Sequence, residues 1–200
     1  RDAFQQRHMN KLEGHYGIGH VRYPTAGGSG KDFAQPMYVN SPYGISLAHN
    51  GNLTNSKALA RELFHAEMRH LNTDSDSEVL LNIFAHELAK QRAILPSAEH
   101  FFQAVRKTHS RCHGAYAVVA LITGFGLIAF RDPKGIRPLV IGEREGKEHK
   151  EYIIASENAS FSALGFETLR DVEPGEAVLI DINGQLHSQQ CADNPEPMPC

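Results

Sequence analysis

The chain has 200 residues, of which 41% are hydrophobic, so it can bury the core of one large domain. Its formal net charge is -3 and it has no block of like charge, which excludes the basic surface expected of a protein that binds nucleic acid or anionic membranes. No apolar stretch approaches the length of a membrane span, and residues 1–20 are too polar for a signal peptide. These properties favour a cytoplasmic protein that acts on small molecules.

The cysteines Cys112, Cys191 and Cys200 are too few and too unevenly spaced for a disulfide framework, which agrees with a reducing compartment. His109, Cys112 and His113 lie within one helical turn, but the sequence supplies no second cluster to complete a zinc site. No metal site is therefore predicted.

The first half of the chain begins with glycine-rich strand and loop patterns. Residues 14–23 predict a strand whose glycines allow close approach of another backbone, and residues 24–33 predict a surface loop. Residues 37–39 and 45–48 flank turn residues at 41–44 and predict a β-hairpin.

The second strand of this hairpin leads to Asn50-Gly51, a dipeptide typical of tight turns. Asn52, Thr54 and Asn55 follow, and all three are good helix N-cap residues. The pattern indicates a turn from a strand into a helix. Such a turn aims backbone N–H groups and a side-chain amide at one point, where they could hold an anion or a developing oxyanion.

Apolar residues at helical spacing predict helices at roughly 55–70, 76–90 and 97–111. The second helix begins at Ser75-Asp76-Ser77-Glu78, which matches a capping box. In that motif the serine accepts from the N3 amide and the glutamate reaches back to the N-cap. Asp76 is thereby expected in the first helical turn.

From Ala115 onward the pattern is that of short strands joined by tight turns. Strands are expected at 117–122, 127–131, 139–142, 152–155, 177–182 and 185–187, with a charged excursion at 143–151 and a short helix at 158–164. The turns indicate meander connections between neighbouring strands. Because strands and helices do not alternate, the sequence predicts an α+β fold with antiparallel sheets.

Arg22, Asn50-Gly51 and Asp76 stand at the ends of predicted elements, and together they suit an amino-acid ligand. A guanidinium binds a carboxylate, a carboxylate binds an ammonium group, and an amide with a backbone N–H holds an oxyanion. Each residue also has a simpler explanation, as a surface ion pair, a turn or a charge that complements the helix dipole. His20 and His49 lie beside these residues and are candidates for a catalytic base.

Several runs of residues together resemble a known family. The runs are Gly17-Ile18-Gly19-His20-Val21-Arg22-Tyr23-Pro24-Thr25-Ala26-Gly27, Leu47-Ala48-His49-Asn50-Gly51-Asn52-Leu53, Ser75-Asp76-Ser77-Glu78, Arg131-Asp132-Pro133-Lys134-Gly135-Ile136-Arg137-Pro138-Leu139 and Ala155-Ser156-Glu157. In order and spacing they resemble the glutaminase domain of amidophosphoribosyltransferases, which are class II glutamine amidotransferases. Other class II amidotransferases share Asn50-Gly51 but typically have Arg-Trp-Ala-Thr where this chain has Arg22-Tyr23-Pro24-Thr25.

The resemblance implies an N-terminal-nucleophile hydrolase fold, an α+β four-layer α/β/β/α sandwich with two antiparallel sheets. In that family an N-terminal cysteine attacks the side-chain amide of glutamine, and its own α-amine serves as the base. Carried over to this chain, Asn50 and the Gly51 N–H would form the oxyanion hole. Arg22 would bind the α-carboxylate of glutamine, Asp76 would bind its α-ammonium group, and Thr25 would line the pocket.

The resemblance also implies the function and organisation of a longer parent protein. Ammonia would pass to a phosphoribosyltransferase domain and convert phosphoribosyl pyrophosphate to 5-phosphoribosylamine in the first step of de novo purine biosynthesis. Residues 1–190 are interpreted as the amidotransferase domain, incomplete at its N-terminus, and the proline-rich residues 191–200 as a linker toward the absent domain. The full-length protein is expected to be a homo-oligomer.

The nucleophilic cysteine is expected upstream of Arg1, so we expect this segment alone to bind glutamine without hydrolysing it. No cofactor is expected in this domain, and Mg²⁺ is expected in the phosphoribosyltransferase domain. An iron–sulfur cluster with Cys200 as one ligand is not expected, because the other ligands are absent from the sequence. Two alternatives stay open: the glutaminase domain of another class II amidotransferase, and a non-catalytic module that binds glutamine or scaffolds a partner.

Overall fold

A computed structural model of the chain describes residues 5, 7, 10–12, 14–21, 33–146 and 149–195. Within these residues the strands form two antiparallel sheets, one six-stranded with the order β1-β2-β3-β4-β8-β9 and one three-stranded with the order β6-β5-β7. The strands are β1 (Met37–Val39), β2 (Ile45–Leu53), β3 (Gly114–Ile122), β4 (Gly126–Arg131), β5 (Val140–Glu145), β6 (Lys150–Ala155), β7 (Glu167–Asp171), β8 (Glu176–Asp181) and β9 (Leu186–Gln190). The helices are α2 (Ser56–His65), α3 (Asp76–Lys90), α4 (Ala98–Arg111) and the 3-10 helix η2 (Ser162–Leu164).

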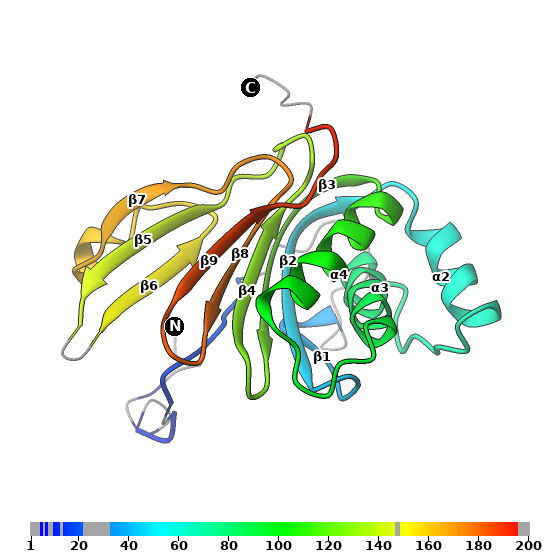
Figure 1. The fold of residues 1–200 in the computed structure, drawn as a ribbon, viewed down its shortest axis with the longest axis horizontal. Helices are drawn as coiled ribbons and strands as arrows, with labels where there is room; N and C mark the ends of the chain where they lie inside the picture. The colour runs from blue at the N-terminus through cyan, green and yellow to red at the C-terminus, as the bar shows by residue number, and fades with distance from the viewer. Residues whose placement is uncertain are drawn as a thin grey trace.

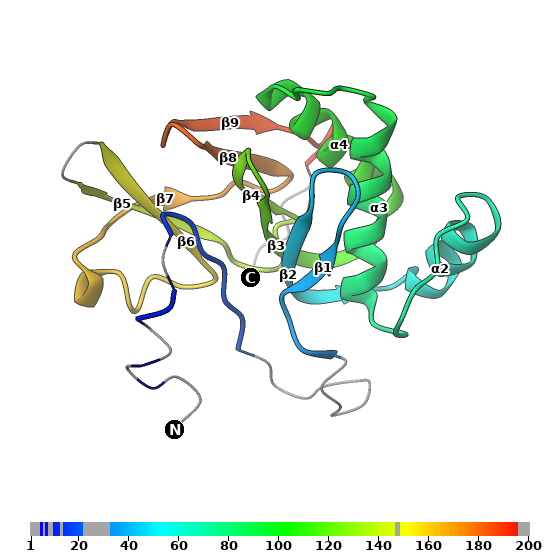
Figure 2. The ribbon, with the colours of Figure 1, turned by 90° about the horizontal axis from the view of Figure 1, so that it is seen from below.

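The six-stranded sheet is covered on both faces. Helices α3 and α4 lie on one face, and the three-stranded sheet lies on the other (Figures 1 and 2). Successive side chains of a strand point to opposite faces of the sheet, so the side chains of β3 pack alternately toward the helices and toward the second sheet. Tyr116 and Val118 pack in the core beneath the helices, whereas Ala117 packs in the smaller core between the two sheets.

The three long predicted helices are confirmed, with one change of length, whereas the short helix predicted at 158–164 is reduced to the 3-10 helix η2. Helix α3 buries the predicted apolar stripe completely, and α4 begins one residue after Ser97. Helix α2 ends at His65, earlier than predicted, because Met68 adopts a positive φ of 53° and the Arg69 N–H turns back to the Leu63 carbonyl at 2.9 Å.

The capping box predicted at the start of α3 is wrong in its bonding. Ser75 Oγ accepts from the N–H of Ser77, the N2 residue, at 3.3 Å. Glu78 accepts from the N–H groups of Asn72 and Thr73, at 2.8 and 2.7 Å, instead of from Ser75. The reason is that the Ser75 N–H already donates to Thr73 Oγ1 at 3.1 Å. Asp76 nevertheless lies in the first turn, as predicted.

The strand predicted at 14–23 is wrong for its described part, since residues 14–21 form no strand. A Cβ added at Gly17 or Gly19 would meet nothing within 4 Å, so these glycines do not mark close approach of another backbone. The segment is instead attached through side chains. The Tyr16 hydroxyl, for example, donates to the Asp181 carbonyl at 2.6 Å.

The strand-rich second half is confirmed in outline, but its connections differ from the prediction. The hairpins β3–β4 and β8–β9 form, whereas β4 pairs with β8 and the chain crosses from β4 to the other sheet. The meander predicted from 127–131 into 139–142 is therefore wrong. The charged residues at 143–151 are also not an excursion, because β5 and β6 continue into them and Arg144 pairs with Glu151.

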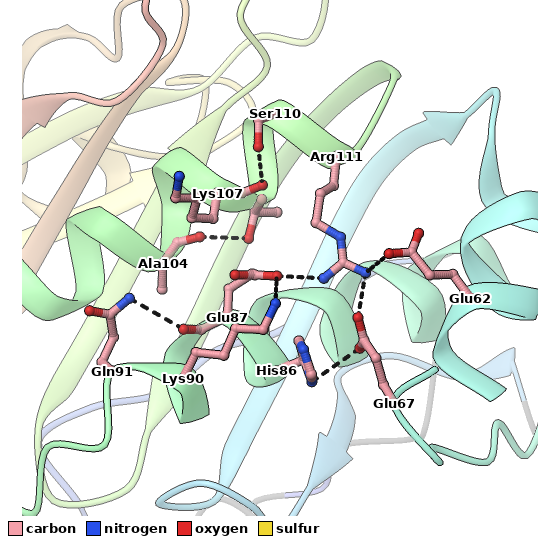
Figure 3. Close-up of polar contacts among 11 residues, drawn as sticks. Glu62, Glu67, His86, Glu87, Lys90, Gln91, Ala104, Lys107, Ser110 and Arg111 are labelled. Atoms are coloured by element: carbon pink, nitrogen blue, oxygen red, sulfur yellow. Dashed lines mark hydrogen bonds and ion pairs between the residues drawn. The ribbon is translucent and has the colours of Figure 1, made fainter. Parts of the chain in front are cut away.

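The helices are joined by a charged cluster centred on Arg111, at the end of α4 (Figure 3). Its guanidinium contacts Glu62 of α2 at 3.1 Å, Glu67 at 2.6 Å, and Glu87 of α3. The side chains of Glu67 and Glu87 are only 7% and 5% exposed, and Arg111 is the cation that they share, while Glu87 also contacts Lys90 at 3.0 Å. His86 contacts Glu67 at 3.1 Å on the far side of the cluster.

We expect Arg111→Met to lower the free energy of unfolding by about 3 kcal/mol, because two nearly buried carboxylates would lose their shared cation. Urea unfolding followed by circular dichroism measures the change. Lys107→Ala is the matched control, because Lys107 is an exposed cation on the same helix. Equal stability of the two variants would contradict the role given to the cluster.

Candidate functional site

The residues expected in the oxyanion hole lie within a strand, not in a turn. Strand β2 continues through Leu53, and its register pairs Asn50 with Ala117 and Gly51 with Tyr116 of β3. The predicted strand-to-helix turn at Asn50-Gly51 is therefore wrong. The chain turns only after Leu53, immediately before α2.

The glycine of this pair is required by the backbone. Gly51 has a φ of +137°, and a Cβ at this position would lie 1.9 Å from the Ala115 carbonyl oxygen. No other residue fits so close to the neighbouring strand without moving the backbone. The Asn-Gly signal thus reflects a positive φ and close backbone packing.

Asn50 lies beside a cavity of about 200 Å³ between the two sheets. Its amide oxygen Oδ1 is 3.0 Å from His20 Nε2, which brings the segment before residue 22 against β2. The lining residues come from four parts of the fold: Gly19, His20 and Val21; Ala48, His49 and Asn50; Ala117 and Val119; and Leu139, Ile154, Ala155 and Ser156. A half-buried amide beside a cavity of this kind can donate to a small polar ligand.

His49 is attached to the helical side of the sheet. Its Nδ1 is 3.0 Å from Ser77 Oγ of α3, and its N–H donates to Gln35 Oε1 at 2.7 Å. Gln35 Nε2 in turn donates to Ser77 Oγ at 3.0 Å, which leaves the serine hydrogen for the imidazole. Burial lowers the pKa of His49 to about 4, with Asp76 opposing the shift and His20 and Arg137 adding to it. His49 is therefore neutral at pH 7.

Asp76 is held at the same end of β2 as Asn50 and Gly51. Its Oδ2 accepts from the Leu53 N–H at 3.0 Å, while Oδ1 has no hydrogen-bond partner among the described residues. Asp76 does not line the cavity beside Asn50. Its half-exposed carboxylate at the amino end of α3 has one oxygen available for a cation.

The structure thus places Asp76 at the end of β2 that carries Asn50 and Gly51 but outside the cavity beside Asn50, whereas Arg22 and Thr25 lie outside the described residues. The contacts of Gln35 and Ser77 with His49 were missed by sequence reasoning. The sequence indicates Ser77 only as part of a helix-capping motif, and it gives no signal for Gln35.

Neither cysteine in the described part of the chain is a reactive thiol. Cys112 and Cys191 are both buried and unpaired, and burial raises the pKa of each thiol to about 12. Cys200 lies outside the described residues. Among the residues that are described, no group of His, Cys, Asp or Glu side chains gathers as metal ligands, and no helix is long and apolar enough to cross a membrane.

Comparison with known families decides the relationship. The model of the glutamine amidotransferase domain matches residues 28–163. The chain belongs to this family. The resemblance noted in the sequence is therefore confirmed at the level of the family.

Relatives of this glutamine amidotransferase domain include curated amidophosphoribosyltransferases. The chain is 58% identical over 200 residues to the one from Pseudomonas aeruginosa and 57% identical over 200 residues to the one from Escherichia coli, and it covers 40% of each. The Saccharomyces cerevisiae enzyme is 53% identical over 184 residues, which are 92% of this chain and 36% of that protein. The chain thus spans about two fifths of the length of these relatives.

A solved structure has the same fold. The chain matches the glutamine phosphoribosylpyrophosphate amidotransferase from B. subtilis, complexed with ADP and GMP, with a TM-score of 0.69 and 32% identity over 88% of this chain and 35% of that one. The predicted α+β class with two antiparallel sheets, in the N-terminal-nucleophile hydrolase architecture, is confirmed. In the described residues, α3 and α4 supply the helical layer on the six-stranded sheet (Figure 2).

We expect Gly51→Ala to lower the free energy of unfolding by at least about 3 kcal/mol, because the new Cβ would collide with the β3 backbone. Urea unfolding measures the loss. Gly124→Ala is the matched control, since Gly124 also has a positive φ, of +83°, but faces open space. The control should lose only about 1 kcal/mol, and similar losses in both variants would contradict the close-packing argument.

We expect acid to destabilise the fold through two buried histidines. Burial lowers the pKa of both His49 and His109 to about 4, whereas both titrate near 6.5 when unfolding exposes them. Their contribution is complete above pH 6.5 and is lost as the pH falls toward 4, by up to about 1.4 kcal/mol per pH unit for each histidine. Urea unfolding at several pH values in this range tests the slope. His109→Gln should reduce it, because that variant has no titrating ring at this buried position.

Proposed function

We propose that this chain is the glutamine-hydrolysing domain of an amidophosphoribosyltransferase, which supplies ammonia for the conversion of phosphoribosyl pyrophosphate to 5-phosphoribosylamine. The observation that carries the proposal is the Asn50 amide beside a cavity between the sheets, next to a glycine whose backbone geometry admits no other residue. The identity of 58% across all 200 residues to an amidophosphoribosyltransferase supports the choice of acceptor.

In this proposal Asn50 and the Gly51 N–H stabilise the oxyanion that forms when a thiolate attacks the glutamine amide. Asp76 holds the α-ammonium group with its oxygen Oδ1, which accepts no hydrogen bond from the described residues, and Arg22 and Thr25 complete the pocket around the α-carboxylate. Because both described cysteines are buried, the nucleophile in this proposal is an N-terminal cysteine with its free α-amine as base.

The cellular setting belongs to the same proposal. A cytoplasmic location suits the free thiols of Cys112 and Cys191. In the full-length protein, ammonia released at this site is consumed in a phosphoribosyltransferase domain that requires Mg²⁺, and the protein acts as a homo-oligomer.

Asn50→Ala in the full-length protein tests the assignment. We expect glutamine-dependent synthesis of phosphoribosylamine to fall by about two to three orders of magnitude, the usual effect of removing one oxyanion donor. Ammonia-dependent synthesis should stay unchanged, because it bypasses glutamine hydrolysis. Asn50 would have no catalytic role if the variant retained its glutamine-dependent rate, and a parallel loss of both activities would indicate a folding defect.

A further inference from the structure

We propose that His20 is a positioning residue that fixes the orientation of the Asn50 side-chain amide. The inference rests on the proposed function, because it concerns how the oxyanion donor is held. It assigns a role to a histidine that is distant from Asn50 in the sequence and belongs to no helix or strand.

The hydrogen of the His20 imidazole is placed by its partner. His20 Nε2 lies 3.0 Å from Asn50 Oδ1. An amide oxygen only accepts hydrogen bonds, so Nε2 must carry the hydrogen and donate it. Nε2 carries a hydrogen in this neutral tautomer and in the protonated ring alike, and His20 can therefore hold the amide in either state.

The bond from His20 fixes the orientation of the whole Asn50 side-chain amide. Its oxygen and its nitrogen lie on opposite sides of one planar group, so a bond that holds Oδ1 also fixes the direction of Nδ2. Nδ2 has no hydrogen-bond partner among the described residues, and Asn50 is half-buried beside the cavity. The donor is thus left free for a ligand. Rotated by half a turn, the amide would present its oxygen, which repels a developing oxyanion.

The surroundings of His20 favour a positioning role over a role as a catalytic base. The nitrogen of His20 that could accept a proton, Nδ1, is buried without a partner among the described residues. The other nitrogen is already engaged with Asn50. An unpaired buried acceptor is costly to keep, which indicates that the ring is held in this orientation by its bond to Asn50 and its packing, not by Nδ1. The geometry therefore assigns His20 to Asn50 and not to the reacting atoms.

A double-mutant cycle in the full-length protein tests the inference, with His20→Ala, Asn50→Ala and the double variant. We expect His20→Ala to lower the glutamine-dependent kcat about tenfold with little change in the KM for glutamine, because the oxyanion exists only in the transition state. In the Asn50→Ala background the same change should cause no further loss, because residues that act through one another are not additive. Ammonia-dependent synthesis should stay unchanged.

Two further variants separate positioning from structure. His20→Gln keeps an N–H donor and should recover part of the lost kcat. His15→Ala removes an exposed histidine from the same segment and should leave all rates unchanged. If His20→Ala fails to fold, the comparison of His20→Gln with the double variant His20→Gln/Asn50→Ala carries the same test.

The inference is overturned by independent, multiplicative losses in the double variant, by a raised KM with unchanged kcat, by equal loss of ammonia-dependent synthesis, or by an unchanged kcat in His20→Ala. A normal glutamine-dependent rate in Asn50→Ala would instead overturn the proposed function, and the role of His20 would fall with it. The two failures are therefore distinguishable.

Discussion

The arrangement of the two sheets depends on one buried carboxylate, that of Asp132, at the point where the chain leaves β4. Asp132 is fully buried and accepts from the N–H groups of Tyr116, Lys134, Ile136 and Arg137, at 3.0 to 3.2 Å. These bonds replace the solvation that a buried charge loses. The neighbouring Arg131 guanidinium donates to backbone carbonyls within and beyond the same loop. Because this crossover leads the chain into β5, it fixes where the second sheet lies over β3, and so where the cavity beside Asn50 lies.

Because successive side chains of β2 point to opposite faces of the sheet, two neighbouring polar residues lie on different sides of it. Asn50 lies beside the cavity between the sheets, whereas His49, one residue earlier, is bonded to Ser77 on the helical side. On the face toward the second sheet, Ala117 of β3 and Ala129 of β4 are small, so these two positions add little bulk to the space between the sheets. Residues that are adjacent in the sequence therefore have different roles: Asn50 is available to a ligand, and His49 joins β2 to the start of α3.

Physical signals in the sequence explain which parts of the fold could be predicted. Helix α3 was predictable because its apolar stripe is completely buried, whereas β7 was missed because its residues are mostly exposed and show no alternation. The prediction of a turn at Asn50-Gly51 was wrong because glycine is favoured wherever φ is positive, and Gly51 adopts a positive φ within a strand. The bond between His20 and Asn50 joins residues 30 apart in the sequence, so no local pattern could reveal it.

In the proposed function, the position of Asn50 on β2 determines how its amide is held ready to stabilise charge. Oxyanion stabilisation requires a donor that is in place before the reaction, since reorganisation during the reaction would cost the energy gained. Gly51 fixes the backbone of β2 against β3, and Asp76 fixes its end through Leu53. The remaining freedom is the rotation of the Asn50 amide, and the bond to His20 Nε2 removes it. In the proposed mechanism the strand places the donor and the histidine orients it, so preorganisation of the site depends on both.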